Sequence, residues 1–337
     1  MAVDDASTDN TQELLSQIHD PRFRYVRNDK NLGAQKNWLN SLELGRGEWL
    51  YLVMGRDKLL GGNITRLIAL LDCSREHNIA FFKDSKLRIG SIRVYNGIDA
   101  MIRFIGWSHP TGSIFNRELF TAIPERARYY ESADVYPENY VIRDLLLKGN
   151  GAVIVSGIIT GEHLVDFLKV KSTVFPAEKL YSAFFAPKRL IKRSLDEFTD
   201  MIDMEAAGTF SRTERDKYFG SKFCSMLEDV SYRWRYWCAN PELMAHYGHS
   251  TRKITFSEML KNILTAYRSA KAHLIERGTY TRRREQMMRI RAAYMAMKTV
   301  IKVAIYDPAK MCAKSILKPL GIWWLLQHLK RLLKSPA

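Results

Sequence analysis

Asp4, Asp5 and Ser7 stand close together near the start of the chain, in a segment that is predicted to be a turn between a strand and a helix. In an open α/β sheet such a turn lies at the carboxyl end of a strand, which is where these folds bind ligands. Carboxylates there can accept hydrogen bonds from the N–H groups of a nucleobase or from ribose hydroxyls. An ordinary turn that caps the following helix uses the same residue types. The residues by themselves therefore leave open both a nucleoside-binding turn and a capping turn.

Three successive segments carry a resemblance to the family 2 glycosyltransferases. Residues 3–11 (VDDASTDNT) are similar to the family's acidic turn, with Ala6 in the place of its usual glycine. Residues 28–37 (NDKNLGAQKN) follow at the family's distance, with Lys36 where arginine is usual. Residues 46–52 (RGEWLYL) resemble the strand that comes next. The order and spacing of the three segments make the resemblance fairly specific, and with later elements it covers roughly residues 1–160.

The resemblance implies an inverting transferase of the GT-A type, whose donor is a nucleoside diphosphate sugar. The donor-binding residues that it implies in the first two segments are Asp4, Asp5, Ser7, Asn31, Gly33 and Lys36. A strand and a helix normally precede the acidic turn in this family. Only residues 1–3 precede Asp4 here, so the first βα unit is predicted to be missing.

A metal loop is the next element of the family. It usually carries two or three aspartates, which hold Mg²⁺ or Mn²⁺ against the diphosphate, because a hard cation prefers oxygen ligands. In residues 53–60 Asp57 is the carboxylate that remains, and Arg56 and Lys58 stand where the flanking aspartates are expected. The resemblance therefore implies Asp57 as the metal ligand. Because the loop departs from the family here, Arg56 or Lys58 could bind the diphosphate directly in place of a metal ion, and we expect Arg56 to do so. The alternative is a degraded loop that binds no metal.

An inverting transferase also needs a general base for the acceptor hydroxyl. The family places it in an acidic pair at the start of a helix, and Glu138 matches that place, with Asn139 where the second carboxylate is usual. The alternative is that Glu138 only complements the helix dipole. Upstream, Trp107 and His109 resemble the loop on the acceptor side, where an indole could stack on a sugar ring.

Short apolar runs alternate with amphipathic helices over about the first 160 residues, which predicts an α/β fold. We expect a GT-A-like, mostly parallel sheet flanked by helices. From about residue 177 long helical segments take over, with residues 257–277 and 282–305 the clearest. The predicted domains are therefore residues 1–176, which would bind the nucleotide sugar, and a helical, basic C-terminal region of residues 177–337.

Positive charge is concentrated at the C-terminal end of the chain. The net charge is +16, and residues 251–337 hold 19 Lys and Arg against 4 Asp and Glu. Trp323 and Trp324 stand beside leucines with lysines nearby, a pattern that suits a helix in a membrane interface. A solvated basic face is the alternative, and no motif indicates nucleic acid as a partner. The sequence shows no signal peptide and no membrane-spanning run, so we expect a cytoplasmic protein that is peripheral on the inner face of the membrane.

Two functions remain at this point. The first is transfer of a sugar, with inversion, from a nucleoside diphosphate sugar to a glycan or lipid-linked acceptor, in bacterial surface polysaccharide synthesis. The second is a truncated, non-catalytic relative that binds a membrane or a partner. The degenerate metal loop and the predicted loss of the first βα unit favour the second, and the three family segments favour the first.

Overall fold

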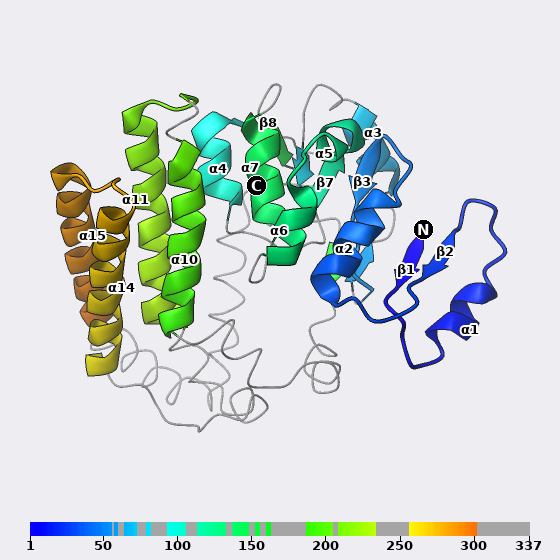
Figure 1. The fold of residues 1–337 in the computed structure, drawn as a ribbon, viewed down its shortest axis with the longest axis horizontal. Helices are drawn as coiled ribbons and strands as arrows, with labels where there is room; N and C mark the ends of the chain where they lie inside the picture. The colour runs from blue at the N-terminus through cyan, green and yellow to red at the C-terminus, as the bar shows by residue number, and fades with distance from the viewer. Residues whose placement is uncertain are drawn as a thin grey trace, which may run out of the picture. The chain divides into compact units, whose positions relative to one another are not determined.

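The computed structural model describes residues 1–55, 57–59, 64–72, 79–81, 93–105, 113–132, 137–147, 152–155, 160–162, 187–204, 208–233 and 256–301 (Figure 1). The chain divides into two compact units, Met1–Ala183 with Glu197–Ser221 and Phe184–Asp196 with Lys222–Ala337. The predicted boundary between residues 176 and 177 lies outside the described residues and stays a prediction. None of the described helices is long and apolar enough to cross a membrane.

The first 43 residues form a small parallel pair of strands with two helices. The elements are β1 (Ala2–Asp4), α1 (Thr11–Ser16), β2 (Tyr25–Arg27) and α2 (Ala34–Glu43). β1 and β2 pair in parallel, with Val3 opposite Val26. The sequence predicts a helix over residues 11–18, a strand over residues 23–26 and a helix over residues 33–44, and each predicted end lies within two residues of the observed one. That a first βα unit is missing stays a prediction.

A sheet of five strands forms the centre of the first unit. Its strands are β3 (Trp49–Tyr51), β5 (Ile79–Phe81), β6 (Arg93–Asn96), β7 (Ser113–Asn116) and β8 (Ala152–Val155), in the order β3-β7-β5-β8-β6. Only β5 and β8 pair in parallel, and the other three pairings are antiparallel. The expected α/β fold is confirmed, but the described pairings are mixed rather than mostly parallel. Apolar runs alternating with helices do not show the direction in which a strand enters a sheet.

Helices cover both faces of this sheet, as expected. In β3, Leu50 packs into the large core, whereas its neighbours Trp49 and Tyr51 pack on the other side with Ile114. Successive residues of a strand face opposite sides of a sheet, so each face has its own cluster. The helices concerned are α3 (Ile64–Asp72) on one face and α4 (Gly97–Phe104), α5 (Arg117–Thr121), α6 (Arg126–Ser132) and α7 (Glu138–Leu147) in the large core.

Helices make up the described part of the chain beyond residue 186, which confirms the predicted helical C-terminal region. They are α10 (Pro187–Ile202), α11 (Arg212–Glu228), the π-helical turn η2 (Asp229–Arg233), α14 (Phe256–Glu276) and α15 (Arg282–Ile301). α14 and α15 lie side by side as a helical hairpin (Figure 1). Arg277 and Gly278 make the turn, with Gly278 in the left-handed conformation that commonly ends a helix.

Candidate functional site

Asp4 ends β1, and its carboxylate is enclosed by donors from the following turn and from β2. Oδ1 accepts from the backbone N–H of Ser7 (2.9 Å), and Oδ2 accepts from the Tyr25 hydroxyl (2.8 Å) and from Arg27 Nη1 (2.5 Å). The parallel register places Asp4 opposite Arg27. Only 1% of the Asp4 side chain is exposed. The Asp4 oxygens are therefore already used by protein donors, and the residue fixes the turn against β2.

These contacts determine the charge of Asp4. Burial by itself raises the pKa of a carboxyl, but the hydrogen bonds from Ser7, Tyr25 and Arg27 outweigh it and lower the pKa of Asp4 to about 2. Arg27 also donates from Nη2 to the backbone carbonyl of Ser7 (2.9 Å). One guanidinium therefore ties both ends of the turn to β2, which the sequence did not indicate.

Asp5 joins the first two family segments. Its Oδ1 accepts from the backbone N–H of Leu32 (2.8 Å) and from Asn28 Nδ2 (2.9 Å), and its Oδ2 accepts from the backbone N–H of Gly33 (3.0 Å). Asn28 Nδ2 also donates to Asn37 Oδ1 in α2 (3.0 Å). The predicted residues Asp5 and Gly33 are thus brought together in one site. Asn28 and Asn37 also belong to this site; both lie in the second family segment, but the sequence did not indicate them as site residues.

Two backbone positions in this site have unusual torsion angles. Ala6 has φ of 57°, and Gly33, directly before α2, has φ of 82° and ψ of 158°. The second combination is almost confined to glycine, because a Cβ would clash with the backbone. Ala6 shows why the family usually has glycine at this place, since the left-handed conformation is costly for alanine.

Asn31 and Lys36 are exposed on the two sides of Gly33. Asn31 Oδ1 accepts from the backbone N–H of Gly33 (3.0 Å), so its side chain helps to order the approach to α2. Lys36 lies in the first turn of α2. Lys36 is exposed and Asp5 and Ser7 are partly exposed, and that these residues bind the donor stays a prediction.

The metal loop is described only in part. Arg56 lies outside the described residues. Asp57 begins β4 (Asp57–Leu59), where it is paired with Glu162 of β9 (Thr160–Glu162) in an antiparallel ladder. The register therefore places a second acidic residue opposite Asp57. Among the residues whose side chains are described, no group of three or more His, Cys, Asp or Glu could hold a metal ion.

Glu138 begins α7, at the place that the sequence predicts. The residue is 1% exposed, and neither carboxyl oxygen has a hydrogen-bond partner within the described parts of the chain. Burial raises the pKa of Glu138 to about 8. Burying an unpaired carboxyl is costly, and such a displaced pKa is typical of functional acids and bases.

Tyr130 and Glu197 lie near the start of α7, and the sequence did not indicate either of them. The buried hydroxyl of Tyr130 has its pKa raised first by burial and then by the charge of Glu138. Asn139 Nδ2 donates to Glu197 Oε1 of α10 (3.4 Å). Residue 139 stands where the family usually has its second carboxylate, and α10 brings Glu197 to that place through tertiary packing. Trp107 and His109, predicted on the acceptor side, lie outside the described residues.

Comparison with known proteins finds a family match in the N-terminal part of the chain. Residues 1–72 match glycosyl transferase family 2. This family 2 segment contains the turn after β1, the loop before α2 and the metal loop, and it supports a glycosyltransferase as the class of the chain. No curated protein matches the sequence. A solved structure of S. aureus TarS 1-349 is similar at 15% identity, with 83% of this chain and 82% of that chain covered and a TM-score of 0.39, which is too distant a likeness to bear on function.

Proposed function

We propose that this protein transfers a sugar from a nucleoside diphosphate sugar to a hydroxyl of a glycan or lipid-linked acceptor, with inversion at the anomeric carbon. The observation that carries the proposal is the Asp5 carboxylate, which joins the acidic turn to the Leu32–Gly33 backbone within the family 2 segment. Synthesis of a bacterial surface polysaccharide is the setting that we propose for this reaction.

The donor lies, in this proposal, against the partly exposed residues of the site. Asp5 and Ser7 accept hydrogen bonds from the nucleoside, while Asn31, the Gly33 backbone and Lys36 face the diphosphate. Asp4 acts as a positioning residue, because its carboxylate is enclosed by Ser7, Tyr25 and Arg27. Arg56 adds positive charge for the diphosphate.

Glu138 is the general base of the proposed reaction. The acceptor oxygen forms a bond to the anomeric carbon on the face opposite the diphosphate, the bond to the diphosphate oxygen breaks, and the nucleoside diphosphate leaves with that electron pair. The proton of the acceptor hydroxyl passes to the Glu138 carboxylate. A base works best when its pKa lies near the working pH, and the pKa of about 8 for Glu138 meets that condition. Trp107 and His109 would contact the acceptor.

Asp57 and Glu162 are the residues that would hold Mg²⁺ or Mn²⁺. Their opposed positions in the β4–β9 ladder supply two carboxylates, and these fit a hard divalent cation better than Asp57 alone. A bound cation would neutralise charge on the leaving diphosphate. Titration of the protein with Mn²⁺, followed by electron paramagnetic resonance, should show weaker binding in Asp57→Asn and in Glu162→Gln. Unchanged Mn²⁺ binding in both variants would rule out this site.

A donor screen tests the reaction. Purified protein is incubated with a set of nucleoside diphosphate sugars and Mn²⁺, or with a chelator, and nucleotide release is measured. We expect Glu138→Gln to lower kcat by a factor of about 10² to 10⁴ while donor binding is retained. In the wild type, kcat/KM should rise with pH up to about 8, the pKa of Glu138, because the base must be ionised.

The matched control is Glu118→Gln, an exposed glutamate in the first turn of α5. It should leave the rate unchanged, because Glu118 shares only the position of Glu138 near a helix N-terminus. If both substitutions have the same small effect, Glu138 only complements the helix dipole. If no donor is bound or hydrolysed, the non-catalytic relative is the better description.

A further inference from the structure

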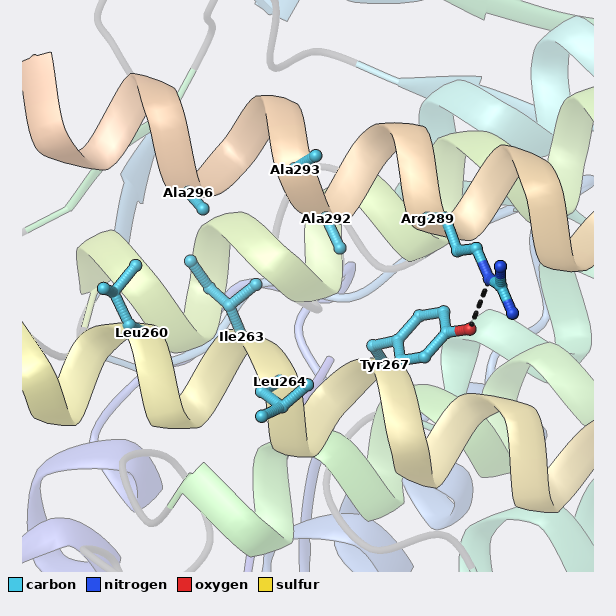
Figure 2. A pocket seen from close by; sticks show the side chains of 8 residues that line it. All are labelled: Leu260, Ile263, Leu264, Tyr267, Arg289, Ala292, Ala293 and Ala296. Carbon is cyan, nitrogen blue, oxygen red and sulfur yellow. Dashed lines mark hydrogen bonds between the residues drawn. The ribbon is translucent and has the colours of Figure 1, made fainter.

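An apolar groove runs between α14 and α15 in the second unit. Its wall on α14 consists of Leu260, Ile263, Leu264 and Tyr267, and its wall on α15 consists of Arg289, Ala292, Ala293 and Ala296 (Figure 2). The alanines leave an open space of about 290 Å³ beside the larger side chains of α14. At one end Arg289 Nε donates to the Tyr267 hydroxyl (3.2 Å).

The groove continues into an exposed apolar stripe on α15. Ile290 is 63% exposed and Met297 is 56% exposed, and they lie seven residues apart, so they share one face of the helix. Tyr294 and Val300, also exposed, lie on the same side of the helix. Ala293 belongs both to the groove and to the exposed side. We call the groove and the stripe together the hairpin surface.

The exposed stripe of the hairpin surface lies on the side of α15 that faces away from its own core. Met288, Met295 and Thr299 are buried, and they occupy the opposite side of the helix from Ile290 and Met297. The exposed apolar side chains of α15 therefore do not belong to the face of the helix that packs into the core. Contiguous apolar surface of this kind usually marks a site of interaction.

The two helices that carry this surface have an excess of positive charge. Residues 256–301 contain 10 Lys and Arg against 3 Asp and Glu. Lys261, Arg268 and Arg282 are exposed on the two helices. A second copy of the chain would bring the same positive charges together, whereas an anionic lipid surface offers both negative headgroups and a place for apolar side chains.

We infer that the hairpin surface docks on an anionic lipid bilayer, with Ile290, Met297 and their neighbours in the headgroup and acyl boundary. The inference refines the proposed function, since a lipid-linked acceptor would be met at such a surface. The link between lipid docking and a lipid-linked acceptor rests on the proposed function. Lipid binding itself is measured without any sugar donor. Failure of one idea is therefore distinguishable from failure of the other.

The experiment measures binding of the full chain to vesicles of phosphatidylcholine alone and of phosphatidylcholine mixed with phosphatidylglycerol. We expect binding to the mixed vesicles only, and we expect it to weaken as salt is added, because salt screens the charges. The double substitution Ile290→Asp with Met297→Asp should weaken binding by roughly tenfold or more, because two apolar contacts are replaced by negative charges. Arg282→Glu should weaken binding to the mixed vesicles without changing any apolar residue.

The matched control is Ile64→Asp with Ile68→Asp on α3, where both residues are 55% exposed. This variant carries the same added charge and should bind the vesicles as the wild type does, and circular dichroism shows that each variant is folded. Equal binding of the wild type, the hairpin variant and Arg282→Glu would overturn the inference. It would also be overturned if the lipid-free protein is a dimer that Ile290→Asp with Met297→Asp dissociates, because a second copy would then cover the surface.

Discussion

At the scale of single residues, the turn after β1 combines a cost and a gain in stability. Ala6 adopts a left-handed backbone conformation, which alanine disfavours, directly after two carboxylates that hold the turn in place. The hydrogen bonds of Asp4 and Asp5 therefore maintain a conformation that the sequence at position 6 opposes. Two substitutions separate these contributions.

Ala6→Gly should stabilise the protein. Glycine adopts φ of 57° without a steric penalty, but it loses more conformational entropy than alanine on folding. The net rise in the free energy of unfolding should be about 0.5–1 kcal/mol. Urea unfolding measures the change. The control is Ala34→Gly at the start of α2, which should have the opposite sign because α-helical conformation favours alanine. A loss of stability in Ala6→Gly would contradict the assigned strain.

Asp4→Asn should lower the free energy of unfolding at neutral pH by roughly 2 kcal/mol, because a buried carboxylate loses its charge-assisted hydrogen bonds. The pKa of Asp4 is lower in the folded than in the unfolded protein. Its stabilisation is therefore complete above about pH 4 and is lost as the pH falls toward 2, where the two proteins should become alike. Unfolding curves at several pH values measure the difference.

Asp20→Asn is the control for this comparison. Asp20 pairs with Arg22 at 2.6 Å, but both side chains are exposed. Exposed ion pairs contribute little, so the substitution should change the unfolding free energy far less than Asp4→Asn does. Equal effects would show that enclosure of Asp4 is not the cause of its contribution.

At the scale of elements, one carboxylate fastens the α14–α15 hairpin. Glu285 of α15 accepts from Lys271 Nζ of α14 (2.7 Å), from Arg289 Nη2 (2.8 Å) and from the hydroxyls of Tyr267 and Tyr280. The hydrogen bond from Lys271 is the largest cause, and the hydroxyl of Tyr280 the next, of a Glu285 pKa lowered to about 2. The hairpin that presents the apolar surface is thus held at its closed end by a charged network.

Glu285→Gln should lower the thermal midpoint of the protein at neutral pH by a few degrees. Because the folded pKa of Glu285 is lowered, its contribution is present above about pH 4.5 and is lost as the pH falls toward 2. Differential scanning calorimetry at neutral and acid pH measures this dependence. The control Glu276→Gln removes an exposed carboxylate from the end of α14. A difference between Glu285→Gln and wild type that is constant with pH would contradict the charged network.

At the scale of the whole molecule, charge and family resemblance lie at opposite ends of the chain. The family 2 segment covers residues 1–72, while nearly all of the excess positive charge lies in residues 251–337. The described part of that basic region is the α14–α15 hairpin. The proposed chemistry and the proposed lipid contact therefore use different residues, and each can be removed without touching the other.

The sequence by itself determined the local features of this protein. The α/β alternation, the helices near residues 34–43 and 256–301, and the family 2 resemblance of the acidic turn all follow from residues that are neighbours in the chain. Turn chemistry and hydrophobic period depend on spacings of a few residues, so they can be read from sequence.

The tertiary structure decided what depends on residues far apart. It placed β7 antiparallel between β3 and β5, opposed Asp57 to Glu162, and brought Glu197 to Asn139. It also enclosed Asp4, which sequence motifs assign to the nucleoside, and buried Glu138 without a partner. Burial and strand register arise from contacts between distant segments, and the pKa of a carboxyl follows from that burial. No spacing within a short motif encodes them.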